Sequence, residues 1–288
     1  MNYDLLISTE QLQQLLADKT PVRIFDCSFD LSDTAAGHRQ FLESHIPGAV
    51  YTHLDTALSD KHGTGVSGGR HPLPTREKFA TWLSSVGLAN DMQAVVYDRN
   101  GANYSGRLWW MLKWAGHANV AVLDGGLQVW QAAGKAIASG EEPAHFQTNF
   151  ALAPELATLV ATKTVANNLG RPVQTLIDAR GAPRFRGEIE PLDPVAGHIP
   201  GALNRPFAQN MGADGKFKPA SELKAEFETL LAGRDPASVV HQCGSGVSAV
   251  PNILAMQLAG LGNVSTMGLY AGSWSDWCSD SSRPMAQG

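Results

Sequence analysis

Short apolar runs alternate with longer segments of mixed polarity along the whole chain. Four of the runs are interpreted as buried strands: 22–26, 94–98, 175–178 and 239–241. Helix-like apolar spacing precedes the second run of each half, at 76–86 and at 221–231. Strands of about five residues that alternate with helices of ten or more favour a parallel sheet covered by helices on both faces. The predicted fold class is therefore α/β.

Landmarks of the first half recur in the same order in the second half. The sequence His-Ile-Pro-Gly-Ala occurs at 45–49 and again at 198–202. Each copy follows an apolar run that ends in aspartate. Leu-Asp-Gly-Gly-x-x-x-Trp at 123–130 is matched by Leu-Tyr-Ala-Gly-x-Trp at 269–274. One repeat at a spacing of about 150 residues indicates a duplicated domain, because solenoid repeats are far shorter.

The length of 288 residues also fits two domains. We predict a first domain over 1–134 and a second over 154–288. The segment 135–153 contains glycine, proline and adjacent glutamates without a sustained period, which is typical of a linker.

Composition and charge exclude several classes of protein. With 43% hydrophobic and 17% charged residues and a net charge of −5, the chain shows no basic stripe, so we expect no nucleic-acid partner. It has no long apolar run and no signal-peptide pattern, so we expect no membrane partner. Cys27, Cys243 and Cys278 are too few and too scattered for a disulfide framework or a metal site. We therefore expect no metal, no cofactor and a reducing cytoplasmic location.

The strongest chemical signal is a cysteine at the end of the fourth apolar run. Cys243 is followed by Gly-Ser-Gly-Val-Ser and then by helix-like apolar spacing. This order places a thiol at the carboxyl end of a strand and the amino end of a helix, where backbone N–H groups and the helix dipole favour a thiolate. Gly244 and Gly246 permit the close backbone approach that such a turn requires. The alternative is a buried core cysteine beside a glycine turn.

Together these motifs resemble the two-domain rhodanese family. The resemblance rests on the duplicated His-Ile-Pro-Gly-Ala, the Asp-Gly-Gly-x-x-x-Trp motif and the Cys-Gly-Ser-Gly-Val-Ser loop, and it extends from about Leu5 to Trp277. It implies two tandem rhodanese-like domains, of which the second is catalytic. The first carries Asp98-Arg99-Asn100 where the second has its cysteine. Within the family, the loop resembles that of 3-mercaptopyruvate sulfurtransferases.

The resemblance implies a sulfurtransferase mechanism. The Cys243 thiolate would take a sulfur atom from a small-molecule donor, become a persulfide, and pass the sulfur to a thiophilic acceptor. Cyanide, a small thiol or a thioredoxin-like protein would serve as acceptor. The loop amides would stabilise the charged sulfur, as an oxyanion hole does. The resemblance assigns this contact with the substrate to Gly244, Gly246, Val247 and Ser248.

The resemblance also implies a group that manages the substrate proton. Ser245 would act with a histidine and an aspartate, which we assign to His71 in His-Pro-Leu-Pro and to Asp55 in Leu-Asp. Each has an alternative interpretation. Ser245 would otherwise cap the following helix, His71 would be an ordinary surface histidine, and Asp55 would cap a short helix.

The resemblance assigns donor recognition to Arg184, the first arginine of Arg-Phe-Arg-Gly, and a guanidinium fork suits the carboxylate or sulfonate of a donor. A solvated surface arginine is the alternative. Mercaptopyruvate enzymes of the family usually carry a second arginine where this chain has Leu192, and Arg186 or Arg205 are candidates for the missing cation. Thiosulfate enzymes place basic residues in the cysteine loop, and this loop has none. We therefore predict 3-mercaptopyruvate as donor, with thiosulfate:cyanide sulfurtransferase as the alternative.

Two other classes of function are less well supported. A phosphatase uses a thiolate in a similar loop but needs an arginine at the end of the loop, where this chain has Ala249. A non-catalytic rhodanese-like binding module need not retain its cysteine, so the intact loop around Cys243 argues against that function.

Overall fold

The computed structural model describes residues 2–63 and 65–288. Met1, where the first predicted domain begins, and Thr64 lie outside the described residues. The chain forms two compact units. Unit 1 comprises Met1–Ser59, Pro74–Leu156 and Met211–Phe217, and unit 2 comprises Asp60–Leu73, Ala157–Asn210 and Lys218–Gly288. Each half of the sequence therefore contributes one loop to the compact unit that the other half builds.

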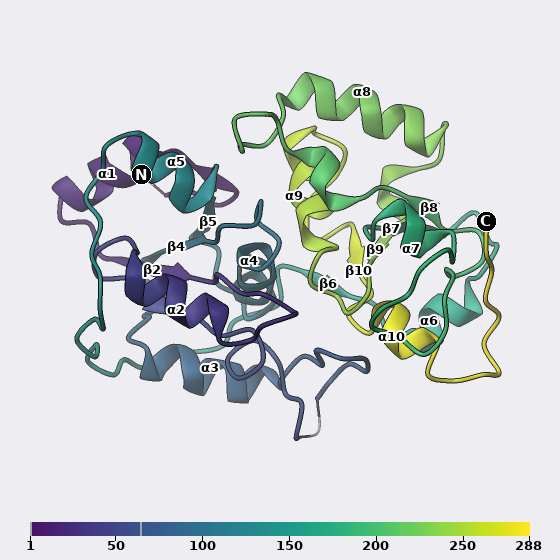
Figure 1. The fold of residues 1–288 in the computed structure, drawn as a ribbon, viewed down its shortest axis with the longest axis horizontal. Coiled ribbons are helices and arrows are strands. Elements are labelled where there is room, and N and C mark those ends of the chain that lie inside the picture. Colours follow the sequence, from purple (N-terminus) through teal and green to yellow (C-terminus); the bar gives the residue numbers. More distant parts are fainter. Residues whose placement is uncertain (1, 64) are drawn as a thin grey trace. The chain divides into compact units, whose positions relative to one another are not determined.

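Each unit contains a parallel sheet of five strands with the same topology (Figure 1). In unit 1 the order is β1-β5-β4-β2-β3, with strands β1 (Leu6–Ile7), β2 (Val22–Asp26), β3 (Val50–Tyr51), β4 (Gln93–Tyr97) and β5 (Val120–Leu123). In unit 2 the order is β6-β10-β9-β7-β8, with strands β6 (Thr158–Leu159), β7 (Thr175–Asp178), β8 (Leu203–Asn204), β9 (Val239–Gln242) and β10 (Gly268–Leu269). The predicted duplication and the predicted α/β class are confirmed.

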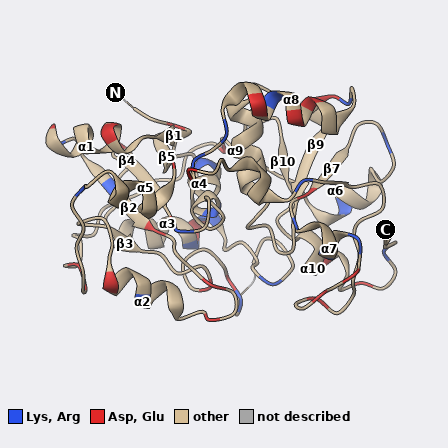
Figure 2. Ribbon diagram, turned by 45° about the horizontal axis from the view of Figure 1, so that its top comes forward, with Lys and Arg blue, Asp and Glu red and all other residues tan. Residues whose placement is uncertain are grey.

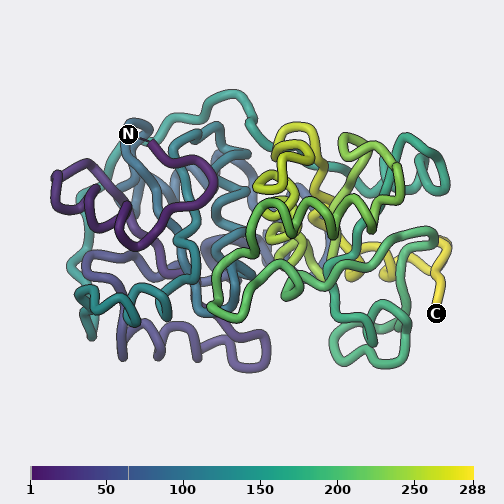
Figure 3. Tube along the Cα trace, turned by 90° about the horizontal axis from the view of Figure 1, so that it is seen from above, coloured from purple at the N-terminus to yellow at the C-terminus, as the bar shows by residue number. Residues whose placement is uncertain are grey.

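Helices connect the strands in both units. Unit 1 contains α1 (Thr9–Ala17), α2 (Ala36–Glu43), α3 (Arg76–Ser85), α4 (Ser105–Trp114) and α5 (Gly126–Ala132). Unit 2 contains α6 (Thr162–Asn167), α7 (Ala182–Phe185), α8 (Ala220–Leu231), α9 (Val250–Leu258) and α10 (Ser273–Trp277), with 3-10 turns η1 (Phe207–Asn210) and η2 (Pro236–Ser238). Helix α8 runs beside α9 (Figure 3). The helices predicted at 76–86 and 221–231 correspond to α3 and α8.

Successive side chains of the strands pack on opposite faces of the sheet, as the pleat requires. On one face of unit 1, Val95 and Tyr97 belong to a buried cluster with side chains of α1, α2 and α5, namely Leu12, Leu15, Phe41, Leu127 and Trp130. Phe25 belongs to β2, and its ring lies 6.0 Å from that of Trp82 in α3. Because both faces are covered, every residue of the central strand β4 is buried, as is typical of parallel sheets.

The predicted linker has a defined path along unit 1. Residues 135–153 form no helix in the described chain, and Ala138 pairs with His45 in an isolated antiparallel bridge. The Glu142 carboxylate accepts hydrogen bonds from the Gly48 amide (2.8 Å) and from His45 Nε2 (3.0 Å). These bonds hold the segment in place without regular secondary structure.

The charged residues do not separate by sign. Lysine and arginine are interspersed with aspartate and glutamate along the ribbon, and α8 carries both signs (Figure 2). Lys224 and Glu228 form an ion pair on this helix. No helix in the described part of the chain combines the length and the apolar character that a membrane span requires.

Candidate active site

Cys243 follows the central strand β9 directly and is 2% exposed. Its amide donates to Ser273 Oγ at 3.1 Å. Its carbonyl accepts from the Trp274 amide at 3.0 Å, and the next carbonyl, of Gly244, accepts from the Ser275 amide at 2.9 Å. The first turn of α10 therefore fixes the backbone where the cysteine loop begins.

Four N–H groups of the same loop bond to no other group in the described part of the protein. Among the described residues, the amides of Gly244, Ser245, Val247 and Ser248 donate no hydrogen bond to another protein group. Gly246 has a φ of +73°, and a Cβ there would lie 2.3 Å from the Ala271 carbonyl oxygen, so only glycine fits this turn. These free donors are available to an anion at the cysteine.

The corresponding loop of unit 1 binds a carboxylate. Asp98 follows β4 as Cys243 follows β9, and its side chain is buried. Its carboxylate accepts from four backbone amides, those of Asn100 (2.9 Å), Ala102 (3.1 Å), Tyr104 (2.8 Å) and Ser105 (2.8 Å). The loop after the central strand of unit 1 is therefore an anion cradle filled by its own carboxylate, and unit 2 has a thiol in that position.

Ser245 and His71 are brought together in unit 2. Ser245 Oγ lies 2.7 Å from His71 Nδ1, and both side chains are buried. His71 is therefore not a surface histidine. Ser245 does not cap α9 either, because the N-cap residue of that helix is Ala249.

The segment that carries His71 lies against the start of α10. The Arg70 amide donates to Ser275 Oγ at 3.1 Å. Gly69 has a φ of +86°, and a Cβ there would lie 2.5 Å from the Gly272 carbonyl oxygen. The helix that fixes the cysteine loop therefore also positions the segment bearing His71.

Asp55 belongs to unit 1, in the turn that follows β3. Its amide donates to His53 Nδ1 at 3.1 Å. Its assignment to the same proton-handling group as Ser245 and His71 stays a prediction.

Arg184 lies in the short helix α7 and is not a freely solvated arginine. Its guanidinium donates to Glu190 Oε1 at 2.6 Å and to Asp193 Oδ2 at 3.2 Å. The same carboxylate of Asp193 forms an ion pair with Arg70 through its other oxygen. Ion pairs of this kind orient a guanidinium as well as neutralise it.

A third arginine connects this network to the cysteine. Arg180 pairs with Asp178 at 2.7 Å and with Glu190 at 3.4 Å, and it lies 4.9 Å from the centre of the Trp274 ring. Burial opposes its charge, but Asp178, Glu190 and the Cys243 thiolate outweigh burial and raise the pKa of Arg180. The site therefore holds a permanent cation within electrostatic reach of the sulfur.

The other candidate groups are poorly suited to chemistry. Burial lowers the pKa of His241 to about 3, so this histidine is neutral near pH 7. Burial is the main cause that raises the pKa of both Cys27 and Cys278, which keeps these thiols protonated and unreactive. Within the described residues, no cluster of histidine, cysteine and acidic side chains could hold a metal ion.

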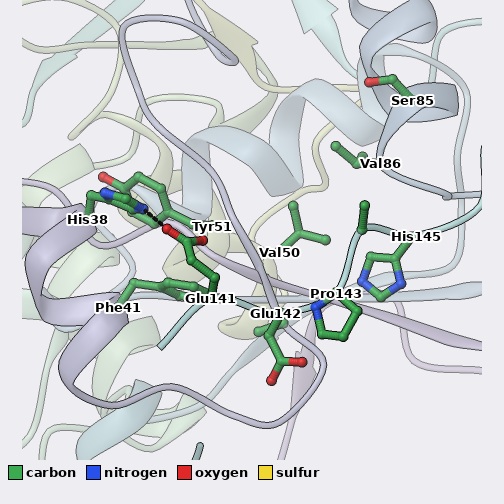
Figure 4. Close-up of a pocket in the computed structure, with 12 residues that line it drawn as sticks. His38, Phe41, Val50, Tyr51, Ser85, Val86, Glu141, Glu142, Pro143 and His145 are labelled. Carbon is green, nitrogen blue, oxygen red and sulfur yellow. Dashed lines mark ion pairs between the residues drawn. The ribbon is translucent and has the colours of Figure 1, made fainter. Parts of the chain in front are cut away.

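Unit 1 has a pocket of about 350 Å³ beside the segment 141–145 (Figure 4). Its polar lining includes Tyr51, Glu142, His145 and the ion pair between His38 and Glu141 at 3.4 Å. It contains none of the predicted site residues and no thiol, so it does not compete with the Cys243 loop as the candidate active site.

Sequence reasoning missed the groups that orient the arginines. Glu190 and Asp193 flank Leu192, a position that the sequence marks only by the absence of an arginine. Arg70 directly precedes His71, and that adjacency was the available signal for its place near the site. Ser273, which accepts from the Cys243 amide, carried no signal in the sequence.

Comparisons with known proteins agree with this geometry. The model of the rhodanese-like domain matches residues 8–133 and again 161–280. A Pseudomonas aeruginosa protein named "Probable 3-mercaptopyruvate sulfurtransferase" is 44% identical over 98% of both chains. The thiosulfate sulfurtransferase of Bos taurus is 32% identical over 96% of this chain and 92% of its own. The crystal structure of an Escherichia coli protein titled as a 3-mercaptopyruvate sulfotransferase is 30% identical, with a TM-score of 0.79, over 95% of this chain and 100% of that one.

The anion cradle of unit 1 can be tested by substitution. Asp98→Asn keeps the shape of the side chain but turns an NH2 group toward backbone donors, which leaves buried N–H groups unpaired. We expect the free energy of unfolding to fall by at least about 2 kcal/mol, measured by urea denaturation. The exposed Asp91→Asn is the matched control and should change it by less than about 0.5 kcal/mol. Equal effects of the two substitutions would contradict the cradle.

Proposed function

We propose that this chain, which belongs to the rhodanese-like family, is a sulfurtransferase that takes its sulfur from 3-mercaptopyruvate through a persulfide on Cys243. The observation that carries the proposal is the buried thiol at the end of β9, followed by a loop in which the amides of Gly244, Ser245, Val247 and Ser248 donate to no other protein group among the described residues. We assign catalysis to the second predicted domain, 154–288, and a supporting role to the first, 1–134.

The first half-reaction transfers a sulfur atom from the donor to Cys243. The Cys243 thiolate attacks the thiol sulfur of the donor, an S–S bond forms, and the donor's C–S bond breaks. The electrons of that bond leave with carbon as the enolate of pyruvate. The proton from the donor thiol passes to the enolate, so the products are pyruvate and an ionised persulfide.

Ser245 and His71 supply a path for that proton. The distance of 2.7 Å between Ser245 Oγ and His71 Nδ1 allows a hydroxyl proton to move to the ring while the hydroxyl takes another from the donor. Asp55 is proposed as the carboxylate that supports the histidine. Thiosulfate needs no such proton transfer, because its leaving group is sulfite, a stable anion, and no carbanion forms.

The second half-reaction transfers the outer sulfur from Cys243 to the acceptor. A nucleophilic acceptor, cyanide or a thiolate, attacks the outer sulfur, and the S–S bond returns its electrons to Cys243. The amides of Gly244, Val247 and Ser248 stabilise the anion before and after each step.

We further propose a reducing, cytoplasmic location and a small thiol or a thioredoxin-like protein as acceptor. The support is that Cys27, Cys243 and Cys278 are all free and buried. A protein thiol as acceptor would have to reach a sulfur on a side chain that is almost wholly covered, which favours a small thiol or one on a projecting loop.

Replacement of the nucleophile gives the most direct test of the reaction. Cys243→Ser should abolish sulfur transfer, because a serine hydroxyl is not an anion near neutral pH. Mass spectrometry of the wild type after treatment with donor alone should show one added sulfur atom, on the peptide that contains Cys243. The peptides that contain Cys27 and Cys278 serve as internal controls and should stay unmodified. A folded variant that retains more than a few per cent of activity would remove Cys243 from the mechanism.

Donor choice is tested by steady-state kinetics with cyanide as acceptor. We expect a higher kcat/KM for 3-mercaptopyruvate than for thiosulfate. Ser245→Ala should lower kcat with 3-mercaptopyruvate by about 10²-fold or more and affect thiosulfate much less, because only the former needs a proton transfer. The exposed Ser221→Ala is the matched control and should change neither. A higher kcat/KM for thiosulfate would replace this assignment with thiosulfate:cyanide sulfurtransferase.

A further inference from the structure

The pocket of about 350 Å³ in unit 1 takes no part in the proposed sulfur transfer (Figure 4). It is lined by residues of α2, of β3, of the end of α3 and of the segment 141–145. Small-molecule sites in proteins usually have volumes of about 300–1,000 Å³ and combine apolar walls with a few polar groups. The composition of the lining therefore decides which class of ligand the pocket suits.

One wall of the pocket is aromatic. The ring of His38 lies 6.4 Å from the ring of Phe41 and 5.1 Å from that of Tyr51, and the last two rings are 5.7 Å apart. The Tyr51 hydroxyl is buried, 2.7 Å from the position that a Cβ of Gly37 would occupy, so the pocket meets the tyrosine ring and not its oxygen. Val50 extends the apolar surface beside these rings. Aromatic faces of this kind pack against an apolar body and also attract cations.

The charged groups of the lining are acidic. Glu142 is fixed through Oε1, which accepts from the Gly48 amide at 2.8 Å and lies 3.0 Å from His45 Nε2. The Gly48 amide is the main cause that lowers the pKa of Glu142, so this carboxylate is ionised near pH 7. In the described chain its Oε2 has no hydrogen-bond partner. Glu141, with a side chain that is 71% exposed, adds a second carboxylate beside His38.

No basic residue of the lining balances these carboxylates. Among the described residues that line the pocket, none is lysine or arginine. Burial and the charge of Arg23 lower the pKa of His145, so this imidazole is neutral near pH 7. Its Nε2 is buried and has no partner within the described part of the chain. Figure 4 shows His145 on one side of Val50 and the pair of His38 and Glu141 on the other.

We propose that this pocket binds a small organic cation, an amine with an apolar body. The ammonium group pairs with Glu142 and Glu141, and the apolar body packs on the rings of Phe41 and Tyr51. The ligand would bridge the segment 141–145 to α2 and β3, so its binding strengthens the attachment of this segment to unit 1.

The site is separate from the proposed function, because the pocket contains no thiol and none of the residues assigned to sulfur transfer. A Cys243→Ser protein should therefore bind the amine as tightly as the wild type. Failure of the sulfurtransferase proposal would leave the tests of the pocket unaffected.

Three probes with one skeleton test the charge preference of the pocket. 2-Phenylethylamine is a cation at pH 8, 2-phenylethanol is neutral and phenylacetate is an anion. By calorimetry we expect a Kd of about 1 mM for the amine, at least roughly 10-fold weaker binding of the alcohol, and no measurable binding of phenylacetate. Equal binding of the amine and phenylacetate, or no binding of the amine at about 20 mM, would overturn the proposal.

Substitutions locate the binding energy at the two carboxylates. Glu142→Gln removes the charge and keeps an oxygen for the Gly48 amide, and we expect it to weaken binding of the amine about 10-fold or more. Glu141→Gln, at an exposed position, should weaken it about threefold. Glu77→Gln, at an exposed position of α3 outside the lining, is the matched control and should leave the Kd unchanged. Unchanged affinity in both folded pocket variants would contradict the assignment.

Hydrogen exchange tests where the amine binds. With 2-phenylethylamine the amides of the peptide 139–148 should exchange more slowly, because the ligand holds this segment against unit 1. Phenylacetate at the same concentration should not change their exchange. Protection that appears only in other peptides would place the amine elsewhere and overturn the proposal.

Discussion

The structure depends on one interaction, the capture of an anion by backbone N–H groups where the central strand of a parallel sheet ends. In unit 1 the anion is the Asp98 carboxylate, which takes four amide hydrogen bonds and is part of the fold. In unit 2 the same position holds Cys243, and the amides of Gly244, Ser245, Val247 and Ser248 lack protein acceptors among the residues described. The duplicated domain thus carries a carboxylate at the end of one central strand and a thiol at the end of the other.

Contacts within unit 2 fix the backbone on which the cysteine loop begins. Helix α10 accepts and donates the bonds that fix the backbone at Cys243, and it also positions the segment that carries His71. Arg180 brings a buried cation near the sulfur, and Glu190 orients Arg184. Buried cations are tolerated here because each has a carboxylate partner, which limits the desolvation penalty of the network.

The architecture and the position of the cysteine after a central strand could be predicted from the sequence because both leave signals in short stretches of residues. Apolar runs gave the strands, the repeated His-Ile-Pro-Gly-Ala gave the duplication, and the strand–cysteine–glycine order gave Cys243. Arg70 could not be predicted, because its place depends on how the segment 60–73 packs on α10. The importance of Asp193 was equally hidden, since a carboxylate next to Leu192 indicates nothing until the two arginines that it bridges are seen together.

The central claim is that the loop of unit 2 binds an ionised sulfur as the loop of unit 1 binds Asp98. A crystal structure of the protein after treatment with 3-mercaptopyruvate tests it most directly. The account predicts a second sulfur atom on Cys243, within hydrogen-bonding distance of the amides of Gly244, Val247 and Ser248. An outer sulfur that points away from these amides, or a loop that refolds to pair them with other protein groups, would contradict it.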